Sequence, residues 1–198
     1  MACGLVAVAV LSLGCRSRLD RLVEVLQERE RAKAAAPPPR RETFRVRDPE
    51  TLIVLEERTG LLDSKGRFVK DGEEWIRYPD GSPRTRRVFA GGVPAGQWLE
   101  WWKNGILRFA HDHQPGETTA MTWWHPNGML QAAGQAQSGL RVGHWTFWDG
   151  RGRPLREGSF EAGQRSGPWV FYGPDGDWAE RGTYQRGAKT EDWELRER

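Results

Sequence analysis

The chain has 198 residues, enough for one or two domains, and its 37% hydrophobic content with 24 glycines is low for an aliphatic core. The net charge is +3, and residues 72–198 contain 16 Lys and Arg against 16 Asp and Glu. A nucleic-acid-binding protein should carry a basic face or stripe, so this balance argues against that class. Cysteine occurs only at Cys3 and Cys15, which excludes a disulfide or a thiolate zinc site from the rest of the chain.

Residues 1–14 are typical of a signal peptide. Residues 4–13 form an apolar run of ten residues, which suits a secretory leader and falls short of the roughly 20 residues that span a bilayer. The run ends in Gly14-Cys15 and resembles a bacterial lipobox, although Ser12 stands where Leu is usual and no basic residue precedes the run. The resemblance implies lipidation of Cys15 and membrane anchoring in the bacterial cell envelope, on its periplasmic face or at the cell surface. The alternative is an apolar leader with a chance cysteine.

Residues 15–40 are expected to form a helix followed by a stiff spacer. Ser17 and Asp20 resemble a capping box, and apolar residues then follow with helical spacing at Leu19, Leu22, Val23 and Leu26. Three prolines at 37–39 end the pattern and favour a polyproline spacer. The apolar stripe either pairs with another helix, or serves as a stalk or docks loosely on the following domain.

Residues 41–71 are predicted to form short strands that cap the first edge of the next domain. Phe44 and Val46 alternate with arginines, and residues 63–66 form a turn signal. An uncapped repeat array would expose an unpaired strand. A second interpretation is a degenerate leading repeat, carried by Leu52, Leu55, Gly60 and Phe68.

Residues 72–198 form a repeat array. The phrase Gly-x-x-x-Gly-x-Trp occurs twice, ending at Trp145 and at Trp169. Extended in both directions, the lead position recurs every 23 or 24 residues, at Trp75, Trp98, Met121, Trp145, Trp169 and Trp193. Such a period is the signature of a repeat architecture. We predict that Trp145 and Trp169 are buried between neighbouring repeats.

Each copy is predicted to be a β-hairpin. The Trp-x-x-aromatic segment is the first strand, Asn-Gly or Asp-Gly sequences form the turn, and residues 155–160 and 179–184 are second strands. A spacing of three puts Trp145 and Trp148 on opposite faces of a regular strand. Either both faces are covered, or one aromatic side chain stays partly exposed.

Residues 163–176 (GQRSGPWVFYGPDG) resemble the bacterial MORN-variant repeat of YwqK-type antitoxin-like proteins, and the likeness covers about residues 72–198. The resemblance implies a mostly β fold, in which tandem hairpins form one elongated twisted antiparallel sheet beside the short N-terminal helix. It also implies binding or scaffolding, with neutralisation of a partner toxin as a further reading. Met121 and a missing second linker glycine depart from the pattern in the third copy. A weaker similarity, through Trp123-Trp124 before an Asn-Gly turn, is to choline-binding-type cell-wall repeats.

The four histidines lie in the central copies. His111 and His113 share one face of a strand, as metal-ligating imidazoles do, and only His125 is near enough to be a third ligand. We interpret them instead as polar residues on a solvated face, and we interpret Asp175 and Asp177 as hairpin-turn residues. No nucleophile elbow, phosphate loop or zinc-protease motif is present, so we predict no enzyme activity and no cofactor.

The second and third copies depart most from the repeat, which makes their aromatic residues and histidines a candidate binding surface. Adjacent tryptophans are hard to bury together in a thin sheet, and exposed apolar patches usually mark interaction sites. The alternative is simple drift, with every ring used in packing. The candidate residues are Trp101, Trp102, His111, His113, Trp123, Trp124 and His125, against the structural positions Trp75, Trp98, Trp145, Trp169 and Trp193.

The sequence therefore predicts a non-catalytic, envelope-anchored repeat protein that acts as a protein–protein binding module or scaffold. One alternative is a cell-wall or carbohydrate-binding module that uses exposed tryptophans. Another, carried by the family resemblance alone, is an antitoxin-like protein.

Overall fold

The computed structural model describes residues 18–35 and 39–197. The chain divides into two units, residues 1–38 and residues 39–198. In the described residues the first unit holds one helix, α1 (Arg18–Ala35), and the second holds a single antiparallel β-sheet. This confirms the predicted fold class in outline, as a mostly β chain of consecutive hairpins with one short helix.

The helix α1 begins inside the predicted capping sequence and ends before the three prolines at 37–39. Proline lacks the amide hydrogen that a helix interior needs, so the sequence cannot continue the helix there. Leu22 and Leu26 of the apolar stripe are exposed on this helix. Cys15 and the predicted signal peptide 1–14 lie outside the described residues.

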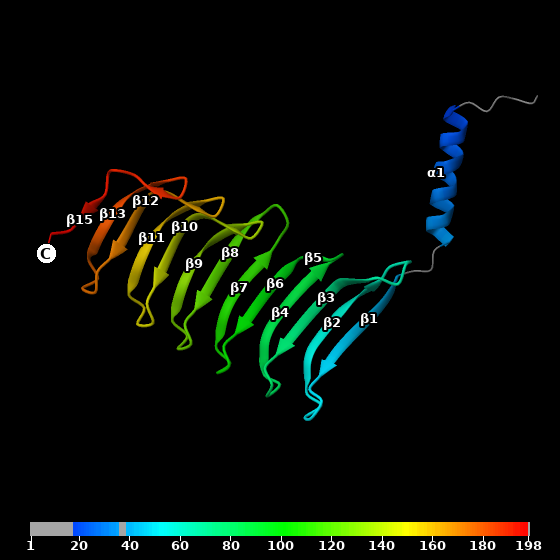
Figure 1. The fold of residues 1–198 in the computed structure, drawn as a ribbon, viewed down its shortest axis with the longest axis horizontal. Helices are drawn as coiled ribbons and strands as arrows, with labels where there is room; N and C mark the ends of the chain where they lie inside the picture. Colours follow the sequence, from blue (N-terminus) through cyan, green and yellow to red (C-terminus); the bar gives the residue numbers. More distant parts are fainter. Residues whose placement is uncertain (1–17, 36–38, 198) are drawn as a thin grey trace, which may run out of the picture. The chain divides into compact units, whose positions relative to one another are not determined.

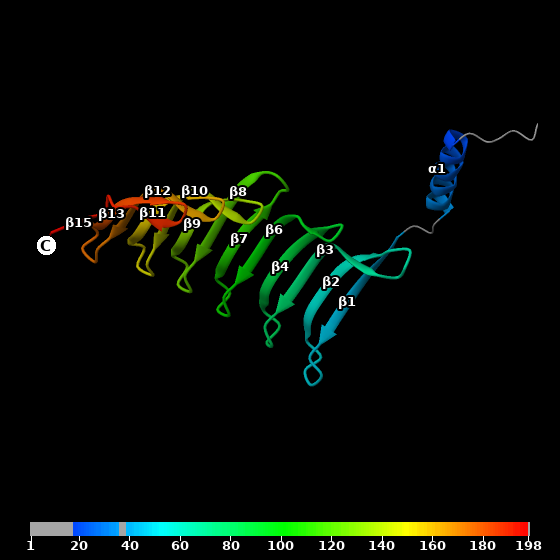
Figure 2. The same ribbon diagram turned by 45° about the horizontal axis from the view of Figure 1, so that its top comes forward.

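In the described residues the sheet of the second unit has 15 strands; β1–β4 and β6–β14 follow one another in chain order along its main path, while β5 pairs with β4 and β15 pairs with β13 (Figure 1). Antiparallel neighbours need only short connections. Figure 2 shows the sheet twisting progressively from β1 towards β13, as the right-handed twist of strands requires. The strands are β1 (Arg40–Arg47), β2 (Val54–Leu62), β3 (Phe68–Arg77), β4 (Pro83–Ala90), β5 (Val93–Pro94), β6 (Gly96–Trp101), β7 (Leu107–His113), β8 (Thr118–Trp124), β9 (Leu130–Gln137), β10 (Leu140–Trp148), β11 (Pro154–Glu161), β12 (Gln164–Tyr172), β13 (Trp178–Gln185), β14 (Ala188–Lys189) and β15 (Glu194–Leu195).

The residues before the predicted array form a hairpin of the same sheet, β1–β2, which pairs with β3. Its first strand lies upstream of Leu52, and Leu52 itself sits in the turn with a φ of 59°. The predicted leading copy therefore starts earlier than its assigned residues. Phe44 of β1 packs edge-on against Phe68 of β3, with ring centroids 4.8 Å apart.

A bulge before each lead tryptophan explains the Gly-x-x-x-Gly-x-Trp phrase. In β10, residues 143–145 stand opposite the single residue Gly134 of β9. Gly143 opens this bulge with a φ of 64°, and Gly167 does the same in β12 with a φ of 70°. Glycine adopts this left-handed conformation without steric cost. The bulge lets the indole ring fold back over the preceding strand.

Glycines in the preceding strands make room for these rings. An ideal Cβ on Gly134 would lie 2.3 Å from the ring of Trp145, and one on Gly158 would lie 2.3 Å from the ring of Trp169. Each indole Nε1 also donates to the carbonyl oxygen ten residues earlier. This bond recurs four times, at Trp98–Val88 (3.0 Å), Trp145–Gln135 (3.0 Å), Trp169–Ser159 (3.0 Å) and Trp193–Thr183 (3.1 Å).

The predicted phase of the first copy is wrong by one residue. Trp98, Met121, Trp145 and Trp169 each lie four residues before the residue that opens the hairpin turn, and Glu74 holds that position before the turn at Tyr78. The register pairs Glu74 with Arg87 and Trp75 with Arg86. Since neighbouring residues of a strand point to opposite faces, Trp75 lies on the face opposite to Glu74. Its indole donates to Glu73 (2.8 Å) instead of to a backbone carbonyl.

The core lies on one face of the sheet, called here the aromatic face. Its buried hydrophobic residues are Met121, Ala132, Ala136, Trp145, Phe147, Phe160, Trp169 and Tyr184. Trp145 is 0% exposed and Trp169 is 1% exposed, which confirms their predicted burial. Trp148 is half-buried, so the second aromatic of this copy stays partly exposed.

Candidate functional site

The predicted Trp and His surface does not form one patch. The side chains of Tyr78, Trp102 and His125 open successive turns, and each donates to a backbone carbonyl in the next hairpin. Tyr78 donates to Trp101 O (2.9 Å), Trp102 Nε1 donates to Trp124 O (2.9 Å) and His125 Nε2 donates to Trp148 O (2.9 Å). Trp102 and His125 therefore join neighbouring turns, and the imidazole needs its hydrogen on Nε2 to do so.

The other tryptophans of the predicted surface pack on different neighbours. Trp101 stacks on Trp75, with centroids 6.2 Å apart and planes 10° apart. Trp123 packs instead on the aromatic face, 4.8 Å from Phe109 and 5.6 Å from Trp145. Trp124 is half-buried and its carbonyl accepts the bond from the preceding turn. The structure thus uses these rings at separate places in the sheet.

His111 and His113 do lie together, on one face of β7 as predicted, but His111 is 4% exposed, so the interpretation of a solvated face is wrong at this residue. Thr119 Oγ1 donates to Asp112 O (2.5 Å), so it accepts from His111 Nε2 (3.0 Å). A neutral imidazole has one donor and one acceptor. His111 Nδ1 is then the acceptor for His113 Nε2 at 3.0 Å. The directions of these bonds assign both tautomers and leave His113 Nδ1 as an acceptor.

The environment keeps this pair neutral. Burial lowers the pKa of His111 from 6.5 to about 4, with a smaller lowering from His113 and an opposing effect of Asp112. Burial likewise lowers the pKa of His113. A hollow of about 320 Å³ adjoins the pair, bounded also by Val93 and Gly116. The described residues contain no group of three His, Cys, Asp or Glu side chains that could hold a metal ion.

The departure of the third copy has a packing reason. His111 stands 13 residues after its lead tryptophan, where the next three hairpins have Gly134, Gly158 and Gly182. The residue that pairs with His111 across β7 and β8 is Met121, and the register of these two strands shows no bulge at this pair. Since no indole ring folds over this position, it does not need glycine. The change at Met121 and the histidine at 111 are therefore coupled.

The aromatic face carries a feature that sequence reasoning missed: Arg141 of β10, Arg156 of β11 and Arg165 of β12, called here the arginine strip. The guanidinium of Arg141 lies over four rings, 5.3 Å from Trp123, 4.9 Å from Trp145, 5.5 Å from Phe147 and 5.4 Å from Phe160. A cation over an aromatic ring contributes about 0.5–2 kcal/mol, depending on desolvation. The side chain thus closes part of the core.

Arg156 and Arg165 continue this arrangement across the next two strands. Arg156 lies 4.6 Å from the ring centre of Phe147, the ring that Arg141 also covers. Arg165 lies 4.8 Å from Trp169 and donates to the hydroxyl of Tyr184 at 2.6 Å. All three arginines are half-buried. Three cations from adjacent strands therefore converge above one aromatic core.

Within the described residues, no carboxylate forms an ion pair with any arginine of the strip. Burial lowers the pKa of Arg141 and the charge of Arg156 lowers it further; burial and then Arg165 lower the pKa of Arg156. The Nε of Arg156 is buried without a hydrogen-bond partner. Desolvation and mutual repulsion both raise the free energy of this cluster.

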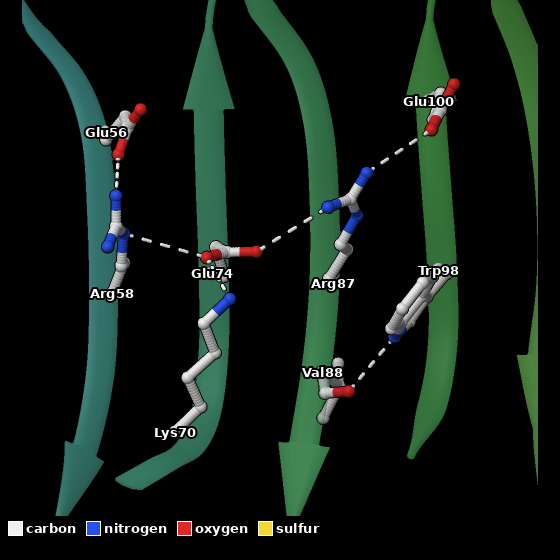
Figure 3. A network of polar contacts seen from close by, with 8 residues as sticks. All are labelled: Glu56, Arg58, Lys70, Glu74, Arg87, Val88, Trp98 and Glu100. Carbon is white, nitrogen blue, oxygen red and sulfur yellow. Dashed lines mark hydrogen bonds and ion pairs between the residues drawn. The ribbon is translucent and has the colours of Figure 1, made fainter. Parts of the chain in front are cut away.

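The basic side chains on the same face of the N-terminal strands differ from the arginine strip, because they form ion pairs with carboxylates (Figure 3). Glu74 is 5% exposed; it lies 2.6 Å from Lys70 Nζ, 3.7 Å from Arg58 Nε and 3.8 Å from Arg87 Nη1. Arg87 also pairs with a second carboxylate, since its Nη2 lies 3.7 Å from Glu100 Oε1. The contrast singles out the arginine strip as the candidate site.

A periodic signal in the sequence marks part of the strip. Arg141 and Arg165 each stand two residues after the linker glycine of their copy, and Lys189 holds the same position in the last copy. Lys189 does have a carboxylate partner, Glu180. The sequence shows this 24-residue recurrence of basic residues, but nothing in it marks Arg156 as lying between two of them.

Asp175 and Asp177, which flank a turn glycine, face Arg196, whose Nη1 lies 3.5 Å and 2.7 Å from their carboxylates. This ion pairing fits their interpretation as turn residues.

Comparison with known proteins finds no matching family model and no matching curated relative. No helix of the described residues is both long and apolar enough to cross a membrane.

Proposed function

We propose that the protein is a non-catalytic, envelope-anchored scaffold of the MORN-variant type, which takes a partner protein on its aromatic face. The observation that carries the proposal is the closure of this face by arginine side chains instead of a second layer. All the regular secondary structure of residues 39–197 belongs to the single sheet, so these residues contribute no helix and no second sheet. The side chains of the arginine strip therefore cover this face and also present positive charge that has no carboxylate partner within the described residues.

The contacts of His111 support a structural role more than a catalytic one. Both ring nitrogens of His111 are engaged, by His113 on one side and by Thr119 on the other. A general base needs a free nitrogen within hydrogen-bond reach of its substrate. We therefore assign His111 to the packing of β7 against β8.

The glycan alternative lacks a comparable observation. Sugar-binding sites of the proposed kind need open indole faces, whereas every Trp of the chain lies in the described residues and is buried or half-buried. The antitoxin reading rests on family resemblance alone. Protein binding is therefore the function that we propose.

Anchoring is the second part of the proposal, and it rests on the sequence at Cys15. Each acyl CH₂ that enters the bilayer contributes about 0.8 kcal/mol, and two or more chains hold a protein stably. Cys15→Ser should release the protein from the membrane fraction and remove the lipid mass from the intact protein. Unchanged fractionation with an unmodified mass would contradict lipid anchoring.

The binding face is tested by photo-crosslinking in cells from two positions of the last repeats. Lys189 pairs with Tyr184 and so lies on the aromatic face, while Arg181 pairs with Val170 on the opposite face. A photoreactive residue at position 189 should give one discrete protein adduct, and the same residue at position 181 should not. Adducts from neither position, or equally from both, would contradict the proposed face.

A further inference from the structure

We propose that the arginine strip binds a short, extended acidic segment of the partner protein, with carboxylates as the recognised groups. This inference rests on the proposed scaffold function and names the chemistry of its partner. It follows from three cations that converge without a counter-charge, from the way the same face satisfies its other cations, and from the spacing of the strands.

The chain itself shows which anion this face accepts. At the N-terminal end, Lys70, Arg58 and Arg87 surround the carboxylate of Glu74. At the C-terminal end, the ammonium group of Lys189 pairs with Glu180. The arginines of the strip lie between these two examples on the same face. A carboxylate from outside would complete the pattern.

The geometry suits an extended segment. Adjacent strands lie about 4.8 Å apart, so β10 to β12 span roughly 10 Å across the sheet. Alternate side chains of an extended peptide point the same way and lie about 7 Å apart. Two or three acidic residues at every second position therefore match the width of the strip. Arg also suits this role because its planar fork binds a carboxylate through two parallel hydrogen bonds.

Nucleic acid is a less suitable occupant. Polyanions are held by a basic stripe that follows many phosphates. The strip covers three strands, and the array that contains it has 16 basic and 16 acidic residues between residues 72 and 198. A short cluster in a neutral array matches a short acidic segment.

The test uses the full chain purified in detergent and two fluorescent ten-residue peptides. One peptide carries Glu at three alternate positions between apolar residues, and the other carries Gln at the same positions. Since each charge-assisted bond is worth roughly tenfold in affinity, the Glu peptide should bind at least about tenfold more tightly than the Gln peptide. Its affinity should fall as salt is added, because salt screens exposed charges. Equal binding of both peptides would overturn the inference.

Variants locate the contact. Arg141→Gln with Arg165→Gln should reduce binding of the Glu peptide at least about tenfold. The matched control, Arg151→Gln with Arg186→Gln, removes two exposed arginines outside the strip and should leave binding within about twofold. Replacing both strip residues by Lys keeps the charge and should restore much of the binding, which separates lost recognition from lost folding. Equal losses in the strip and control variants would overturn the inference.

Two further arms separate the possible failures. Anionic phospholipid vesicles and a single-stranded DNA oligonucleotide should not compete with the Glu peptide at equal charge concentration; if either binds the strip while the peptide does not, the acidic-segment inference is wrong. The crosslink from position 189 should disappear in the Arg141→Gln, Arg165→Gln variant. A crosslink that survives would keep the scaffold function and refute the role of the strip, whereas no crosslink in the unmodified chain would refute the scaffold function itself.

Discussion

Replacing Gly158 by Ala separates local strand preference from tertiary packing. The backbone φ at Gly158 is not in the left-handed region, so alanine is conformationally allowed and should gain about 0.5–1 kcal/mol over glycine in a strand. The structure predicts the opposite sign. A Cβ there would lie 2.3 Å from Cδ2 of Trp169, against about 3.5–4.0 Å for a favourable carbon–carbon contact. The ring must therefore move by more than about 1 Å.

The cost follows from what the ring would lose. Trp169 is 1% exposed and its Nε1 donates to Ser159 O at 3.0 Å. Overpacking costs about 1–3 kcal/mol, and a weakened hydrogen bond costs about 1 kcal/mol. After the gain from alanine is subtracted, the net loss is about 2 kcal/mol. For a protein of this size, that loss lowers Tm by about 4–8 °C.

Thermal and urea unfolding followed by tryptophan fluorescence measure this effect. Gly150→Ala is the control, because its φ is also ordinary and its nearest neighbouring atom would be 3.9 Å away; its stability should change by less than about 0.5 kcal/mol. In a Trp169→Ala background, Gly158→Ala should cost nothing, because the clash is gone. If the single variant Gly158→Ala melts at or above the wild-type temperature, the ring-on-glycine packing is wrong.

Three further predictions concern stability. The pKa of His111 is lowered from 6.5 to about 4, so the fold favours its neutral form. The stability that this preference brings is present above pH 6.5 and is lost as the pH falls from about 6.5 to 4. At about 1.4 kcal/mol per pKa unit, the loss should be roughly 3 kcal/mol. Urea unfolding at several pH values in that range gives the free energy of unfolding as a function of pH. This free energy should depend less steeply on pH for His111→Gln than for the wild type, and an equal dependence would contradict the assignment. Glu74→Gln leaves three cations without their buried carboxylate and should cost about 3–5 kcal/mol, whereas Glu57→Gln, which removes the partner of the exposed Arg45, should cost less than about 1 kcal/mol in the same urea titration; equal losses would refute the buried network. Trp145→Ala should cost about 3–5 kcal/mol, more than Trp178→Ala on a half-buried ring, and a Tm unchanged by Trp145→Ala would place the ring outside the core.

The repeat was predictable because its devices are local. A turn that needs left-handed backbone selects glycine, so Gly105, Gly128 and Gly176 mark the hairpins in the sequence alone. The same reasoning predicted the burial of Trp145 and Trp169, since a thin sheet has few other large side chains to bury, but the role of Gly143 and Gly167 in opening a bulge emerged only from the strand register. Helix α1 was predictable for an equally local reason, its capping sequence and the prolines beyond it.

The phase of the first copy and the position of the site were decided only by the tertiary structure. A slip of one residue moves a strand's side chains to the other face, and sequence alone could not choose between Glu74 and Trp75 as the lead residue. The Trp and His cluster was close in sequence but was divided between turns and opposite faces by the strand register. Arg141, Arg156 and Arg165 come together because three registers and three long side chains converge on one core. No local pattern records that convergence, because it is a property of neighbouring strands and not of any one of them.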